Sequence, residues 1–210
     1  MRTYVFTLAI LTLPVLGFSQ SVFFVNLNAG IDKTANTYYN YNNYEIFDND
    51  GSELSFGADL GYKFSEKVRF RLASRLGSYS YGQYYTGSDL EQTRMTLHYV
   101  NLNPHLDFRV LAKGKFELFL SPGWRFEFIT DSEQETLKLD GTTSDASYVS
   151  GAYSEKMGGF VAEGILKYNV NNHFGVTLSP GYTVFTKELY AKNDNALTRF
   201  SARFGIEYSF

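Results

Sequence analysis

Charged side chains recur at alternate positions within apolar segments of this chain of 210 residues, and they are its first candidates for chemistry. Arg69, Arg71 and Arg75 lie at odd-numbered positions of a segment, residues 68–76, whose even-numbered positions are mainly apolar. Asp107 and Arg109 share a parity in a later segment of the same kind. Residues two apart point to the same face of an extended strand but to different sides of a helix. Each segment is therefore predicted to be a strand with one charged face.

Both signs of charge occur in similar number on these faces, so the predicted interior network is ion-paired. Two roles for it are open: a selective anion path or proton relay, or structural filling of a narrow interior. We favour structural filling. The predicted network comprises Asp59, Arg69, Arg71, Arg75, Asp107, Arg109, Glu117, Arg125, Glu127, Glu163, Lys167, Arg199, Arg203 and Glu207.

Other candidate chemistry is sparse. The sequence contains neither Gly-x-Ser-x-Gly nor His-Glu-x-x-His around its three histidines. Asp48-Asn49-Asp50-Gly51 is similar to part of a calcium loop but lacks established later ligands, so an Asx-rich turn is the simpler interpretation. The absence of cysteine excludes thiol catalysis and thiolate metal sites. We expect no enzymatic activity, no metal and no cofactor.

Tyrosine-rich stretches between the strands are the candidates for recognition of a glycan or a protein. The alternative is that the strands extend as hairpins and the tyrosines mark a membrane interface. Both interpretations stay open. The recognition candidates are Tyr38, Tyr39, Tyr41, Tyr44, Tyr84 and Tyr85.

Eight segments with this two-residue alternation must position the charged side chains. They cover residues 23–32, 53–64, 68–76, 102–110, 116–128, 160–170, 174–184 and 199–210. Before the fourth segment, Met95, Leu97 and Tyr99 are out of phase with its apolar positions, which predicts a bulge near Val100–Asn101.

The connections alternate between tight turns and long loops, which is typical of transmembrane barrels. Tight turns are expected at 65–67, 112–115 and 171–173, and long loops at 33–52, 78–92, 131–156 and 186–197. The predicted fold class is all-β, an eight-stranded antiparallel up-and-down transmembrane β-barrel.

The apolar face is predicted to lie outside, because its many bulky side chains would overfill the interior of an eight-stranded barrel. Glycines such as Gly57, Gly123 and Gly181 fall on the polar face, which suits the crowded concave side. A lipocalin-like barrel with an apolar interior is the rejected alternative. In a bilayer, that arrangement would place the strand arginines in contact with lipid, which would destabilise the barrel by ~2–4 kcal/mol for each arginine.

Residues 1–19 are expected to be a signal peptide, since an apolar run after Arg2 ends in Gly17 and Ser19, and residues 20–210 to be the barrel domain. The formal net charge of −3 argues against nucleic-acid binding. A mean hydropathy of −0.24 excludes a helical membrane protein with several spans.

The last segment carries a resemblance to a known family. A terminal Phe210 preceded by Tyr208, Ile206 and Phe204 resembles the C-terminal insertion signal of bacterial outer-membrane barrels. Asn103-Pro104 and Ser121-Pro122-Gly123 are similar to the family's proline-bearing central hairpin. The chain as a whole resembles eight-stranded barrels of the OmpA and OmpX type, and most closely the porin-family "outer membrane protein beta-barrel domain" and PorT-like proteins.

This resemblance implies a monomer in a bacterial outer membrane, with periplasmic termini and surface loops, in contact with lipid and lipopolysaccharide. It also implies recognition of the C-terminal signal by the barrel-assembly machinery. The expected role is structural, or surface interaction through the long loops. A narrow porin-like channel for small solutes is the first alternative. A lipid A-modifying enzyme is less favoured, because none of the histidines has the serine two positions later that lipid A deacylases carry.

Overall fold

The computed structural model describes residues 22–35, 39–41, 44–48, 53–85, 90–138, 141–147, 155–186 and 197–210, so the expected signal peptide and Tyr38 lie outside the described residues. These ranges contain no helix with the length and apolar character of a membrane span. The strands are β1 (Phe23–Ala35), β2 (Tyr39–Tyr41), β3 (Tyr44–Asp48), β4 (Glu53–Lys63), β5 (Val68–Tyr85), β6 (Leu90–Lys113), β7 (Phe116–Lys138), β8 (Thr143–Ser147), β9 (Lys156–Asn169), β10 (Phe174–Phe185) and β11 (Thr198–Ser209).

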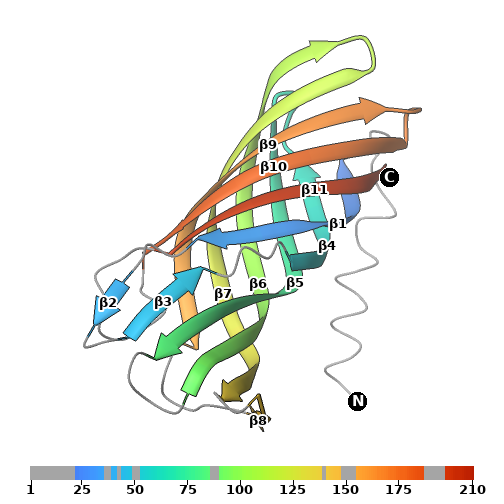
Figure 1. Cartoon of the computed structure of the whole chain (residues 1–210). Coiled ribbons are helices and arrows are strands. Elements are labelled where there is room, and N and C mark those ends of the chain that lie inside the picture. Colours follow the sequence, from blue (N-terminus) through green and yellow to red (C-terminus); the bar gives the residue numbers. More distant parts are fainter. Residues whose placement is uncertain are drawn as a thin grey trace, which may run out of the picture.

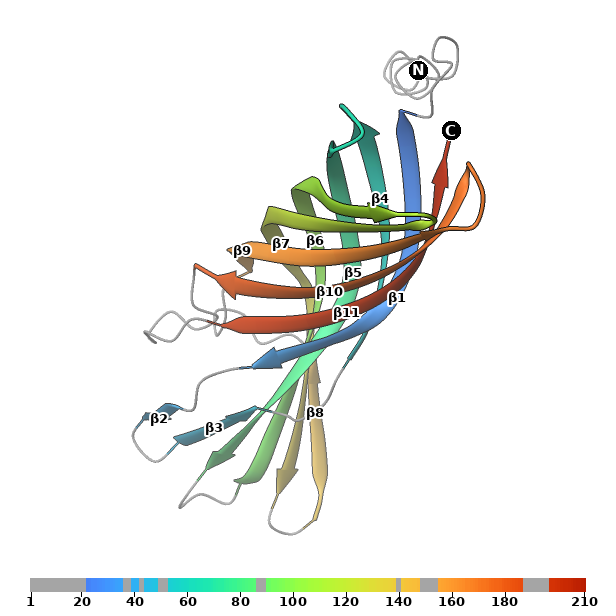
Figure 2. The ribbon, with the colours of Figure 1, turned by 90° about the horizontal axis from the view of Figure 1, so that it is seen from above.

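Eight of these strands close into a ring in which every neighbour is antiparallel (Figures 1 and 2). The order around the ring is β5-β4-β1-β11-β10-β9-β7-β6, and β6 pairs again with β5. The first and last strands of the chain therefore lie side by side, with Val25 opposite Tyr208. The predicted eight-stranded antiparallel barrel is confirmed.

The two ends of the barrel differ. At one end short connections join β4 to β5, β6 to β7 and β9 to β10, and the chain closes there with Phe210 N–H donating to Phe23 O at 3.1 Å. We call this end the short-turn rim. At the other end β5, β6 and β7 project beyond the ring together with β2, β3 and β8 (Figures 1 and 2). The expected loops 78–92 and 131–156 are thus partly strand, because paired hairpins continue past the ring.

The barrel has its apolar residues outside and its charges inside. Leu27 is 64% exposed and Phe204 58%, whereas Arg71 is 2% exposed. A Cβ built on Gly57 would collide with the Arg75 side chain, which shows how crowded the concave face is. The structure thus agrees with the predicted orientation of the two faces.

The predicted bulge near Val100–Asn101 is wrong. The β5–β6 register runs without interruption from Val68 opposite Phe108 to Gln83 opposite Thr93. The irregularity lies instead in β7, where Thr130 is the extra residue between the partners of His98 and Tyr99. Because β6 has no bulge there, Leu97 and Tyr99 lie on the same face of the strand as Asn101, which is the interior face.

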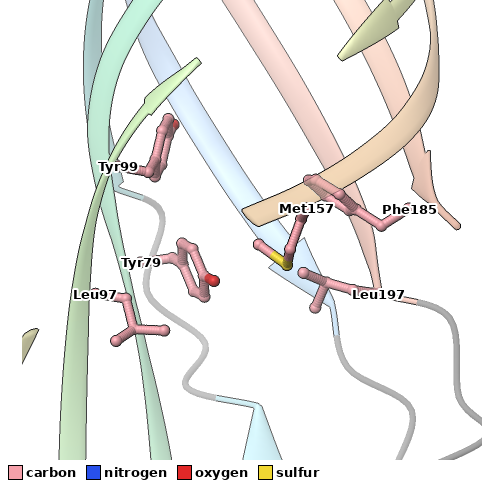
Figure 3. Packing of buried hydrophobic residues seen from close by; sticks show 6 residues of the cluster. All are labelled: Tyr79, Leu97, Tyr99, Met157, Phe185 and Leu197. Atoms are coloured by element: carbon pink, nitrogen blue, oxygen red, sulfur yellow. The ribbon is translucent and has the colours of Figure 1, made fainter. Parts of the chain in front are cut away.

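An apolar cluster inside the barrel explains why Leu97 and Tyr99 depart from the outward pattern (Figure 3). Six buried side chains form it, with Ile129 packed against them. They are Tyr79, Leu97, Tyr99, Met157, Phe185 and Leu197, and we call them the apolar cap. The cap occupies the part of the interior that lies away from the short-turn rim.

If the exposed outer face contacts lipid, the cost of an arginine on that face should depend on its depth in the bilayer, and β10 allows a test. Leu178 lies near the middle of β10 and Phe174 at its short-turn end, and they are 49% and 47% exposed. Leu178→Arg should lower the free energy of unfolding by ~2–4 kcal/mol in bilayers, and Phe174→Arg by roughly 0–1 kcal/mol. Urea titration of both variants in lipid vesicles measures the difference. Equal losses would contradict a lipid-facing belt.

Candidate functional site: the charged interior

Twelve of the fourteen predicted network residues are buried inside the barrel. The other two, Arg109 and Glu117, lie at the short-turn rim, where their side chains are 20% and 17% exposed and joined at 2.9 Å. The alternation of β5, β7 and β11 brings side chains from distant parts of the sequence into one interior. The interior is therefore the candidate site, and its contacts fall into three levels.

Arg71 on β5 organises the middle level. Its Nη2 lies 2.6 Å from Glu163 Oε2, its Nη1 3.2 Å from Asp59 Oδ2, and its Nε 3.2 Å from Asp107 Oδ2. Arg75 also pairs with Asp59. One guanidinium thus joins three carboxylates carried by three different strands.

The level nearest the short-turn rim is built on Glu207 of β11. Its carboxylate accepts from Arg69 Nη1 at 2.9 Å and from Lys167 Nζ at 2.5 Å. The Arg69 guanidinium also lies 4.6 Å and 3.9 Å from the ring centroids of Phe24 and Phe119, so it packs between two interior aromatics.

A pocket of about 590 Å³ enters the barrel from this rim. Its lining includes turn residues such as Ser65 and Glu66 and interior residues such as Arg69, Phe119 and Lys167. Two of its lining residues, Arg69 and Lys167, are the partners of Glu207.

The third level adjoins the apolar cap and centres on Arg199. Both terminal nitrogens of Arg199 bind Glu127, at 2.6 and 3.1 Å, and its Nε donates to Thr34 Oγ1 at 2.9 Å. The guanidinium lies 4.5 Å from the Tyr99 ring centroid and 5.3 Å from that of Phe185. The cap therefore covers this ion pair.

Asp32 and Tyr99 belong to the same level, although neither is among the predicted network residues. Asp32 accepts from Arg203 Nη2 at 2.6 Å and from Tyr99 O–H at 2.5 Å. The parity of Asp32 on the polar face of the first strand was the available signal. Tyr99 carried no such signal, because an aromatic ring at an interior position looks, in the sequence, like a shift in the alternation of polar and apolar residues.

A serine, a histidine and an aspartate meet in the interior without forming a catalytic triad. Ser121 Oγ lies 3.1 Å from His105 Nδ1 and also donates to Asp107, so the serine stands between the other two. In a triad the histidine occupies that position and takes the serine proton. All three residues are buried, and the described residues contain no metal-ligating group of three or more acidic or histidine side chains.

The remaining predicted sites lie outside this network. Phe204, Ile206 and Phe210 are exposed on the outer face, and the Tyr208 ring contacts the Phe210 ring at 5.0 Å between centroids. Their role as an insertion signal stays a prediction. Among the candidate tyrosines, Tyr39, Tyr41 and Tyr44 lie in β2 and β3, and Tyr84 and Tyr85 at the end of β5. The backbone register sets Tyr44 opposite Tyr85.

Solved structures that align with this chain include outer-membrane proteins. OprG from Pseudomonas aeruginosa aligns over 91% of this chain and 97% of its own, with a TM-score of 0.56 and 13% identity. Neisserial surface protein A aligns over 90% and 97%, with a TM-score of 0.50 and 15% identity. The outer membrane protease OmpT from Escherichia coli aligns over 93% and 99%, with a TM-score of 0.49 and 11% identity.

No protein-family model and no curated protein matches the sequence. At these identities, the likeness to OprG and to Neisserial surface protein A shows a shared fold and nothing further. The chain has the fold of small outer-membrane β-barrels.

The middle level predicts a contrast between two arginines. Arg71→Met leaves three buried carboxylates short of a partner and should lower the free energy of unfolding by ~3–5 kcal/mol. Arg109→Met removes a solvent-accessible pair at the rim and should cost about 0–1 kcal/mol. Chemical unfolding of both refolded variants supplies the comparison, and a similar cost for the two would refute an energetically coupled interior.

Proposed function

We propose that the protein is an integral barrel of a bacterial outer membrane whose lumen is filled rather than conducting, and that it is not an enzyme. The observation that carries the proposal is the inverted polarity of the barrel. Thirty large apolar side chains of the described residues are exposed, while most of its ion pairs are buried inside. Such a surface is stable in hydrocarbon and a liability in water.

Several features support the outer membrane as the location. Strands can cross a bilayer only as a closed barrel, because every backbone polar group must be satisfied internally. The shared fold with OprG and Neisserial surface protein A, the expected signal peptide and the C-terminal aromatic pattern favour the same location. The short-turn rim, where β1 begins and β11 ends, would then face the periplasm.

The ion pairs favour a filled lumen over a narrow channel. Arg71–Glu163 joins β5 to β9, Arg69–Glu207 joins β5 to β11, and Arg199–Glu127 joins β11 to β7. In the ring of eight, each pair links strands three positions apart, so the side chains cross the lumen rather than line it. The apolar cap adds a second obstruction beyond the third level.

The buried position of the Ser121, His105 and Asp107 cluster supports a role without catalysis, since no substrate can reach it without disrupting the network. A lipid-modifying enzyme would also need its reactive groups near the lipid, whereas these face inward. The projecting hairpins leave surface interaction as the role that we favour.

Planar bilayers test the filled lumen. Purified protein should migrate faster unboiled than boiled on a denaturing gel, which reports a folded barrel, and should then show no steady unitary current in bilayers. A variant that shortens both members of one crossing pair, Arg71→Ser with Glu163→Ser, should admit current if it folds by the same gel assay. Steady channels from the natural sequence would overturn the proposal in favour of a porin-like channel.

The tyrosine-rich hairpins make a separate prediction for surface interaction. A printed glycan array probed with the labelled barrel should show binding that falls at least tenfold when Tyr84 and Tyr85 are changed to Ser. The matched control changes Tyr62 and Tyr168 to Ser at the short-turn end of the barrel and should bind normally. Equal binding by all three proteins, or none by the natural one, would count against a glycan site on the hairpins.

A further inference from the structure

Arg125 is the exception in the interior network. The side chain is fully buried, yet none of its three guanidinium nitrogens has a hydrogen-bond acceptor among the described residues. The nearest carboxylate oxygen is Glu127 Oε2, 3.9 Å from Nη1. That carboxylate already accepts two hydrogen bonds from Arg199. Arg125 therefore lacks the partner that each neighbouring arginine has.

The charges of the interior show the same deficit. Among the described residues, seven buried cationic side chains face six buried carboxylates. The cations are Arg69, Arg71, Arg75, Arg125, Arg199, Arg203 and Lys167, and the carboxylates are Asp32, Asp59, Asp107, Glu127, Glu163 and Glu207. The interior is thus short of one negative charge, and a buried charge is stable only when it is paired.

Other unused donors surround the third level. Arg203 binds Asp32 through Nη2, while its Nε and Nη1 make no hydrogen bond, and the carboxylate oxygen facing Nη1 is Glu163 Oε1 at 3.9 Å. Asn101 stands opposite Glu127 in the β6–β7 register; its Oδ1 accepts from Asn103, and its Nδ2 has no hydrogen-bond partner. Arg125 belongs to this level through Glu127, and Arg203 belongs to it through Asp32, which also binds the Tyr99 hydroxyl. The unpartnered N–H donors of Arg125, Arg203 and Asn101 therefore outnumber the unpartnered acceptors on the residues beside them, which are Asn103 Oδ1 and Glu163 Oε1.

We infer that the barrel holds one small monovalent anion of the halide class at Arg125, with Arg203 and Asn101 as further donors. One negative charge balances the interior, and an acceptor without protons suits the unpartnered N–H groups of Arg125. A divalent oxyanion would bring more charge than the deficit and would meet Asp32 and Glu127 nearby. The anion is a fixed part of the network, since the apolar cap and the Arg71 level enclose it on both sides.

The anion site lies inside the barrel and is independent of where the barrel resides. A bound anion gives Arg125 the counter-charge that ion pairing within the chain does not supply. The anion does for Arg125 what Glu127 does for Arg199 and what Asp32 does for Arg203.

The test measures unfolding at constant ionic strength while chloride is replaced by gluconate, which is too large for the interior. Above the dissociation constant, each tenfold rise in chloride should raise the folding equilibrium constant of the detergent-refolded barrel up to tenfold. Arg125→Met should abolish this dependence, whereas Arg109→Met, which removes a rim arginine, should keep it. A natural protein equally stable in chloride and gluconate would overturn the inference, as would an unchanged chloride dependence in Arg125→Met.

A second readout does not require the variant to fold. A crystal of the natural protein grown in bromide should show an anomalous peak within hydrogen-bond distance of the Arg125 guanidinium. Bromide peaks confined to the barrel surface, with only water at Arg125, would contradict the bound anion.

Discussion

Every strand of the ring is hydrogen-bonded on both sides, and the rest of the molecule follows from that closure. The β5–β6 pairing leaves the eight ring strands without a free edge, so the backbone satisfies its own polar groups. The outer surface can then be largely apolar, as Leu60 and Phe204 illustrate. Closure also encloses a narrow interior, which the alternation of the strands fills with polar side chains.

An enclosed set of charges is stable only if its members neutralise one another. Burying an ion pair carries a desolvation penalty that Coulomb attraction alone often fails to offset. Here additional hydrogen bonds contribute: Ser121 donates to Asp107, Asn26 to Asp59, and Arg199 reaches Thr34. The apolar cap removes water from the Arg199–Glu127 pair and strengthens its attraction. Arg125 is where this internal compensation ends.

Much of this architecture could be predicted from the sequence, because the two-residue period specifies both the strands and their faces. The charged face of β5 and the apolar face of β11 could each be recognised from the sequence of that strand alone, without knowledge of its neighbours. The pairing within the interior could not be predicted, since Arg71 and Glu163 are separated by 92 positions and meet only after closure. Leu97 and Tyr99 suggested a bulge for a physical reason. An apolar side chain at an interior position breaks the alternation in the same way as a bulge, and only the β5–β6 register distinguishes the two.

The central claim is that one parity of each strand faces lipid and the other faces a filled interior. The chain has no cysteine, so single cysteines can be placed along β11 from Arg199 to Tyr208 and spin-labelled. In vesicles, accessibility to molecular oxygen should alternate with a period of two, high at Phe200, Phe204 and Ile206 and low at Ser201 and Arg203. No alternation, or the opposite phase, would contradict the account.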